Sequence, residues 1–200
     1  MIAVVDSGVA NLRSVSNTLK HIGAQHRIAH TPADLDGADR IILPGVGAFA
    51  AGMDQLRQRG FVEPLRALAR QGVPILGICL GMHMLFDRSE EMGVYEGLGL
   101  LAGDVVRFPV QGPKVPHIGW NQLEHDGSSP LLHGVPVGGY AYFVHSYYAR
   151  TASPEMILAG TDYGIKFPAV VGQGNVFGAQ FHPEKSQHTG QRILKNFAEM

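Results

Sequence analysis

The chain has 200 residues, and 45% of them are hydrophobic, which is enough apolar side chain for a single domain over residues 1–200 with a sizeable core. Its 16 Lys and Arg against 17 Asp and Glu give a net charge of −1, so it lacks the broad positive field that binds nucleic acid or an anionic membrane surface. No apolar run approaches the ~20 residues of a membrane span, and the sequence does not have the pattern of a signal peptide. The single cysteine excludes an internal disulfide, so we expect a protein of a reducing cytoplasm.

The first half of the sequence alternates between short apolar runs and segments with helical periodicity. The runs predict strands over residues 2–6, 25–29, 40–43 and 74–78. The helical segments cover residues 11–21, 53–59, 61–71 and 80–86. Continuous apolar strands that alternate with helices are typical of parallel strands covered on both faces. This half therefore predicts an α/β fold.

The second half has a different pattern of predicted elements, with several strand-like segments and little helix between them. The strands are predicted over residues 101–108, 115–123, 140–147, 156–160, 169–171 and 175–181, and a final helix over residues 188–198. We expect these strands to extend the first sheet in an antiparallel manner rather than to form a second domain. The predicted architecture is a three-layer α/β domain with a mostly parallel central sheet.

Cys79 lies where a predicted strand ends and a predicted helix begins, between Gly77 and Gly81. That context is typical of a nucleophile elbow, in which the reactive residue occupies a strained turn and the flanking glycines avoid collisions with neighbouring backbone. The N–H groups at a helix start also favour a thiolate. The alternative is a small buried hydrophobe, because free cysteines are often buried. The strand-to-helix context favours the nucleophile.

A cysteine nucleophile needs a base and a group that orients the base. His182 follows an apolar segment near the C-terminus, and Glu184 comes two residues later. Residues two apart in an extended segment project to the same side, so Glu184 is expected to accept from one ring nitrogen while the other faces the thiol. Taken alone, the pair is compatible with an ordinary histidine beside a solvated glutamate; together with Cys79, it predicts a catalytic triad.

A tetrahedral oxyanion needs hydrogen-bond donors. The N–H of Leu80 is one candidate, and the turn at residues 44–47, which includes Val46 and Gly47, is the second. A competing interpretation is dinucleotide binding, because residues 45–50 match G-x-G-x-x-A after a strand. The acidic residue at a suitable distance, Glu63, falls in a predicted helix rather than at a strand end, which weakens this alternative.

Several motifs together resemble the class I glutamine amidotransferases, and more narrowly the glutaminase subunits of imidazole glycerol phosphate synthase. The elbow at residues 77–82 and the segment at 181–186 are similar to the class-wide motifs. Motifs similar to those of the subunits lie at residues 11–15, 44–49, 114–121 and 142–147. They cover essentially the whole chain in the expected order. The resemblance implies a flavodoxin-like fold.

The resemblance also implies a mechanism and a partner. Cys79 attacks the side-chain amide of L-glutamine, His182 passes the proton to the leaving ammonia and then activates water, and Glu184 holds the ring. Ammonia passes to a separate (β/α)8 cyclase subunit that makes imidazole glycerol phosphate and an aminoimidazole carboxamide ribotide. The oxyanion loop, here the peptide around Val46, is expected to be misarranged until that partner and its nucleotide are bound.

The resemblance assigns substrate contacts to four positions. His83 stands where the family usually has a substrate-binding glutamine, so we expect altered affinity or pH response rather than loss of activity. Glu91 is placed to meet the α-ammonium, with a solvated helix end as the alternative. The main chain of Ser146 and Tyr147 is placed to grip the substrate backbone, although a half-buried aromatic strand explains Tyr147 equally well. A second departure, Ala10 in place of a glycine, affects only the local turn.

The expected partner interface comprises Asn11, Trp120, Asn121 and Tyr142. Aromatic side chains are concentrated at interface hot spots, which favours Trp120 as an exposed anchor, with core packing as the alternative. The ten histidines lack the close spacing of metal ligands, so no metal site and no cofactor is predicted. Two rival functions remain open: a stand-alone cysteine hydrolase of γ-glutamyl compounds, and a non-catalytic assembly subunit.

Overall fold

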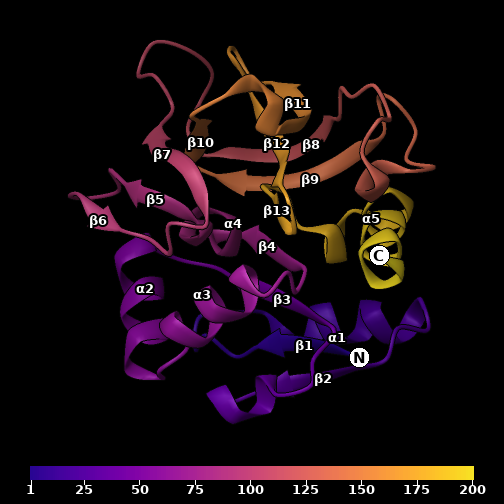
Figure 1. Cartoon of the computed structure of the whole chain (residues 1–200). Coiled ribbons are helices and arrows are strands. Elements are labelled where there is room, and N and C mark those ends of the chain that lie inside the picture. The colour runs from indigo at the N-terminus through magenta and orange to yellow at the C-terminus, as the bar shows by residue number, and fades with distance from the viewer.

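A computed structural model describes all residues of the chain, 1–200, and has a seven-stranded central sheet in the order β11-β12-β13-β4-β3-β1-β2 (Figure 1). Five strands are mutually parallel: β1 (Ile2–Val5), β2 (His26–Ala29), β3 (Arg40–Gly45), β4 (Ile75–Cys79) and β13 (Val176–Ala179). Two more extend the sheet in an antiparallel manner: β12 (Lys166–Gln173) and β11 (Ile157–Asp162). The parallel part, β2-β1-β3-β4-β13, has the flavodoxin-like strand order.

Helices cover both faces of this sheet. One face carries α1 (Leu12–His21) and α5 (Gln187–Glu199); the other carries α2 (Phe49–Gln58), α3 (Val62–Arg70) and the short α4 (Leu80–Leu85). Side chains of β1 alternate between the two layers, since Ile2 and Val4 join the core beneath α1 and α5, whereas Ala3 and Val5 join the opposite core. The predicted three-layer α/β architecture is confirmed.

The sequence led us to expect that the strands of the second half extend the central sheet, but only some of them do. A separate four-stranded sheet in the order β10-β7-β5-β6 is built from β5 (Phe86–Ser89), β6 (Tyr95–Glu96), β7 (Leu101–Arg107) and β10 (Tyr147–Thr151). An isolated antiparallel pair is built from β8 (His117–Gln122) and β9 (Tyr140–His145). The antiparallel extension is therefore limited to β11 and β12. Alternating polarity indicates which face of a strand is buried, but it does not select the strand's hydrogen-bonding partner.

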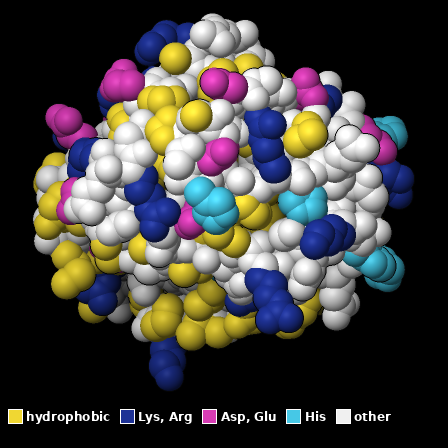
Figure 2. Space-filling view, turned by 90° about the horizontal axis from the view of Figure 1, so that it is seen from below, with side chains coloured by type: hydrophobic (Ala, Val, Ile, Leu, Met, Phe, Trp, Pro, Cys, Tyr) yellow, Lys and Arg dark blue, Asp and Glu magenta, His cyan; other side chains and the backbone are white.

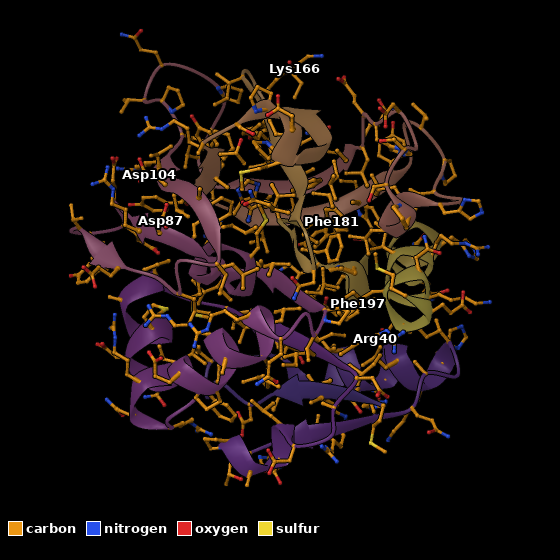
Figure 3. All side chains as sticks on the ribbon, viewed as in Figure 1. Arg40, Asp87, Asp104, Lys166, Phe181 and Phe197 are labelled. Carbon is orange, nitrogen blue, oxygen red and sulfur yellow. The ribbon has the colours of Figure 1, made fainter.

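The two smaller sheets lie on opposite sides of the central sheet. The β10-β7-β5-β6 sheet packs on the side of α2 and α3, and the β8-β9 pair packs on the side of α5 (Figure 1). Figure 3 shows Phe181 and Phe197 in the interior between the central sheet and α5, and both are fully buried. Four 3₁₀ helices occupy Pro32–Leu35, Pro130–Leu132, Pro154–Met156 and Pro183–Lys185.

The surface carries charges of both signs. On the face seen in Figure 2, Lys and Arg side chains are interspersed with Asp, Glu and His, in keeping with the net charge of −1. None of the helices is both long enough and apolar enough to cross a lipid bilayer.

Candidate active site

Cys79 occupies the tight turn that the sequence predicts. It ends β4 and precedes α4, with φ of +54°, a value that is uncommon for a residue with a side chain. The flanking glycines make the turn possible: a Cβ on Gly77 would lie 2.6 Å from the Gly81 carbonyl oxygen, and a Cβ on Gly81 would lie 1.7 Å from the Leu43 carbonyl oxygen. Backbone strain at one residue is retained here because the surrounding strands leave the cysteine no other conformation.

His182 and Glu184 form the expected pair, but through a different local geometry. Nδ1 of His182 lies 2.8 Å from Oε1 of Glu184, and the side chains are 3% and 2% exposed. The connecting segment is not extended as predicted, because Pro183–Lys185 forms one turn of 3₁₀ helix. That turn, rather than strand alternation, brings the carboxylate back to the ring.

The ring of His182 interacts with both Cys79 and Glu184. Burial opposes a charge on the imidazole, but hydrogen bonds to the Cys79 thiol and the Glu184 carboxylate outweigh it and raise the pKa of His182 to about 9. A histidine with this pKa holds a proton at neutral pH, and its partners are a thiol and a carboxylate. This is the arrangement that an ion pair between a thiolate and an imidazolium requires.

Nine of the predicted site residues line one cavity of about 290 Å³: Val46, Gly47, Cys79, Leu80, His83, Glu91, Ser146, Tyr147 and His182. They come from the carboxyl ends of β3 and β4, from α4, from the segments after β5 and β13, and from the β9–β10 connection. The carboxyl ends of the strands are where open α/β sheets bind their ligands. Sequence reasoning missed three further lining residues, Pro116, Val144 and His145. The position of His145 directly before Ser146 was the signal that could have identified it.

The two N–H groups expected to stabilise the oxyanion, those of Leu80 and Val46, are not equally free to donate into the cavity. Leu80 is the first residue of α4, where N–H groups lack intrahelical partners. The N–H of Val46, in contrast, donates a 2.6 Å hydrogen bond to the carbonyl oxygen of Val9, in the loop between β1 and α1. The structure therefore does not offer the Val46 N–H to the cavity, and this conformation has no complete oxyanion hole involving that group.

Two of the predicted substrate contacts have hydrogen-bond partners within the chain. Nε2 of His83 lies 2.8 Å from Oε1 of Gln180, and burial lowers the pKa of His83 to about 4, so its ring is neutral near pH 7. Glu91 accepts a 2.8 Å hydrogen bond from the N–H of Phe49 through Oε2, at the start of α2. Each side chain still borders the cavity, so each is held in a defined position beside it.

The four predicted interface residues do not share one surface. Trp120 is 46% exposed and contacts the ring of Tyr142 edge-on, at 5.9 Å between centroids, on the outer face of the β8-β9 pair. Asn121 projects from the opposite face of β8, where its Nδ2 donates to the Asp162 carbonyl at 2.8 Å, and its place at the interface stays a prediction. Asn11 caps α1 by accepting from the N–H of Ser14.

The dinucleotide alternative does not fit the structure. Glu63 lies in α3, exposed, and pairs with Arg66 on the same helix, whereas a ribose-binding acid belongs at a strand end. The glycine-containing turn at Val46 and Gly47 borders the Cys79 cavity instead. No group of three or more His, Cys, Asp or Glu side chains is arranged to hold a metal ion.

The fold is that of the class I glutamine amidotransferases, and the chain belongs to that family, whose model, described as glutamine amidotransferase class-I, matches residues 3–200. A solved structure described as a glutamine amidotransferase has the same fold, with a TM-score of 0.79 at 22% identity, covering 99% of this chain and 97% of the other.

Curated relatives narrow the assignment. The chain is 50% identical over 197 residues to imidazole glycerol phosphate synthase subunit HisH of Desulfitobacterium hafniense (strain Y51), covering 98% of this chain and 93% of the relative. It is 48% identical over 206 residues to the HisH subunit of Syntrophotalea carbinolica, with 100% of both chains covered. Within the class I family, the chain therefore groups with the HisH subunits.

Proposed function

We propose that this chain hydrolyses L-glutamine to glutamate and ammonia through a thioester on Cys79, and that it delivers the ammonia to a cyclase subunit. The observation that carries the proposal is the convergence of Cys79 and His182, from segments about a hundred residues apart, on one cavity, with Glu184 bonded to Nδ1 of His182. This convergence provides a nucleophile, a proton carrier and an orienting carboxylate in the relation that acyl transfer needs.

In the first half of the reaction, the Cys79 sulfur attacks the side-chain amide carbon of glutamine and the carbonyl π electrons move to oxygen. When the tetrahedral intermediate collapses, the C–N bond breaks and His182 gives its proton to the departing nitrogen, so ammonia leaves. In the second half, His182 takes a proton from water, whose oxygen attacks the thioester. The C–S bond of the second tetrahedral intermediate then breaks, so glutamate leaves and the sulfur departs as a thiolate beside the protonated His182. Glu184 holds Nδ1 throughout.

The reaction needs a completed oxyanion hole. The Leu80 N–H is one proposed donor, and the loop that includes Val46 and Gly47 is the other. Since the Val46 N–H is bonded to Val9, the loop must rearrange before it stabilises the oxyanion. A missing oxyanion donor costs about 10²–10³ in rate, so we expect a slow glutaminase until a partner or ligand favours the rearranged loop.

The proposed glutamine pose places the polar groups of the amino acid against named positions. The α-ammonium lies near the carboxylate of Glu91, which is held by the N–H of Phe49. The α-carboxylate lies near the main chain of Ser146 and Tyr147, and the neutral ring of His83 borders the same space. Opposite charges on Glu91 and the ammonium, and N–H donors for the carboxylate, match the zwitterion.

The outer face of the β8-β9 pair supports the proposed docking of a partner. Ile118, Trp120 and Tyr140 are 60%, 46% and 55% exposed, and Val144, which follows Tyr142 on the same face of β9, borders the cavity. An exposed aromatic surface that is continuous with an active-site rim is typical of an interaction site. We propose that a (β/α)8 cyclase subunit of imidazole glycerol phosphate synthase covers this face, forming a cytoplasmic heterodimer in histidine biosynthesis.

The test is glutaminase kinetics with and without a cyclase subunit and its nucleotide ligand. We expect a low rate for the chain alone and an increase of about 10²-fold or more in the complex. An equal rate in both conditions would favour a stand-alone γ-glutamyl hydrolase. No glutamine hydrolysis in either condition would favour a non-catalytic assembly subunit and would overturn the proposal.

A further inference from the structure

Two buried histidines that take no part in the proposed hydrolysis lie at the cavity: one lines its wall, and the other packs behind the first. His117 comes from β8 and His145 from β9, and they are 3% and 6% exposed. Nδ1 of His117 lies 3.0 Å from Nε2 of His145, and Nδ1 of His145 lies 2.8 Å from the carbonyl oxygen of Tyr147. A continuous hydrogen-bonded line therefore runs from β8 to the main chain of the cavity wall.

The donor and acceptor roles along this chain of hydrogen bonds follow from its last acceptor, the carbonyl oxygen of Tyr147. A carbonyl oxygen only accepts, so Nδ1 of His145 carries the hydrogen and donates to Tyr147. Desolvation lowers the pKa of His145 to about 3 and that of His117 to about 4, so both rings are neutral near pH 7. Nε2 of His145 is then an acceptor, and Nδ1 of His117 must donate to it. Nε2 of His117 is left as an acceptor, 3.4 Å from Nδ2 of Asn121.

Aromatic packing fixes the orientation of the first ring. His117 is stacked between Phe143 and Tyr163, with ring centroids 4.9 and 4.0 Å away. The hydroxyl of Tyr163 in turn donates to the carbonyl of Lys114 at 2.7 Å, which holds that ring in place. Because His117 has little freedom to rotate, its donor is permanently aimed at His145.

The hydrogen bond from His145 holds the main chain of Tyr147, at the start of the edge strand β10. The N–H of Phe108 donates to the carbonyl of Ser146 at 3.2 Å, so Phe108 and Ser146 form a hydrogen-bonded position of the β7-β10 pair. Antiparallel pairs alternate, which places the N–H and carbonyl of the next residue, Tyr147, away from β7. That side is open because β10 is an edge strand. The His145 ring occupies the carbonyl and leaves the N–H of Tyr147 as the donor at this edge.

We propose that His117 and His145 are positioning residues that hold the main chain of Tyr147 so that its N–H meets the α-carboxylate of the bound amino acid. The proposal rests on the proposed glutaminase function, because the amino acid is the substrate of that reaction. The two histidines act on substrate affinity and do not touch the scissile amide.

The kinetic test replaces His117, which does not line the cavity. His117→Phe keeps a stacked ring but removes the donor, whereas His117→Asn retains an N–H near the position of Nδ1. With the cyclase subunit present, we expect His117→Phe to raise the KM for glutamine about tenfold and to change kcat by less than about threefold, as loss of a ground-state contact predicts. For His117→Asn, we expect a KM within about threefold of wild type.

A labelling control separates positioning from general damage to the site. Iodoacetamide reacts with Cys79 without using the Tyr147 main chain, so His117→Phe is expected to react at the wild-type rate. Equal slowing of iodoacetamide labelling and glutamine turnover would overturn the proposal, as would a KM within twofold of wild type. A wild-type complex without glutaminase activity would instead overturn the proposed function, and the positioning role with it.

A second measurement uses the unmodified chain and does not depend on how the variants fold. Nitrogen-15 NMR of the imidazoles distinguishes the two neutral tautomers. We expect His117 and His145 both to be protonated at Nδ1 and unprotonated at Nε2 at pH 7. Protonation of His145 at Nε2 would break the line in the middle and would overturn the proposal.

Discussion

Oε1 of Glu184 accepts a hydrogen bond from Nδ1 of His182 across 2.8 Å, in surroundings that leave both side chains almost fully buried. The carboxylate thereby fixes which ring nitrogen faces it and leaves the other for the Cys79 thiol. It also favours the charged ring, since the pKa of His182 is raised to about 9 against the opposing effect of burial. The orientation of the proposed base thus depends on this carboxylate, and its proton affinity depends on Cys79 and Glu184 together.

Removing that charge is expected to impair catalysis more than binding. In Glu184→Gln, the amide no longer stabilises an imidazolium and does not select the same tautomer, so we expect kcat for glutamine to fall about 10²–10⁴-fold, with a smaller change in KM. Steady-state kinetics in the complex measures both parameters. Glu63→Gln is a matched control, because that glutamate is 73% exposed on α3. Equal kcat values for the two variants would contradict the role of Glu184.

The same pair predicts a pH dependence of stability. The folded-state pKa of His182, about 9, lies above the ordinary 6.5, so its contribution to stability is fully present below about pH 6.5 and is lost as the pH rises through about 9. The loss is on the order of 3 kcal/mol for a shift of this size. Urea unfolding at pH 6.5 and 9.5 measures it. We expect a smaller loss in Glu184→Gln than in wild type; an equal loss would show that Glu184 does not raise the pKa.

Much of the first half of the fold could be predicted from local patterns. The strand ending at Cys79 and the helix after it are specified by an apolar run, a Gly-x-Cys-x-Gly turn and helical periodicity, all within about a dozen residues. Strand partners in the second half could not be predicted, because β7 and β10 pair with each other across about forty residues and no local signal favours that pairing over the central sheet. The short strand Phe86–Ser89 was missed for the same reason.

Because backbone packs closely around Gly81, we expect one added methyl group there to lower the stability of the fold strongly. In Gly81→Ala, the added Cβ would lie 1.7 Å from the carbonyl oxygen of Leu43, and the clashing atoms are backbone of a central strand, which has little room to adjust. We expect a loss of at least about 3 kcal/mol in the free energy of unfolding. Gly112→Ala is the control, because a Cβ there meets nothing within 4 Å, and we expect a change within about 0.5 kcal/mol. Similar values for the two variants in urea unfolding would contradict this account of the turn.

Trp120 tests the proposed docking face. Its side chain is 46% exposed rather than buried in the core, so Trp120→Ala is expected to weaken binding of the cyclase subunit by about 1–3 kcal/mol with little loss of stability. Ile157→Ala is the control, because Ile157 is similarly exposed, at 40%, but lies on β11 outside the β8-β9 face. Titration calorimetry that finds the same affinity for both variants would place the interface elsewhere.

The site was predictable where chemistry and local motif coincide, and not where it depends on contacts between distant segments. Cys79, His182 and Glu184 stand in short motifs that indicate their roles. The hydrogen bond from Val46 to Val9 joins two loops, and nothing in either loop's sequence indicates which way that peptide points. His145 was set aside among ten scattered histidines, because its neighbours come from other strands.

The central claim is that Cys79 is the nucleophile of a glutaminase that supplies ammonia to a partner. Cys79→Ala in the complex with a cyclase subunit tests it most directly, by comparing synthesis driven by glutamine with synthesis driven by added ammonia. We predict that glutamine-dependent turnover falls by at least about 10³-fold while ammonia-dependent turnover stays within about twofold of wild type. Continued glutamine consumption by this variant would contradict the claim, because no other cysteine is present to form the thioester.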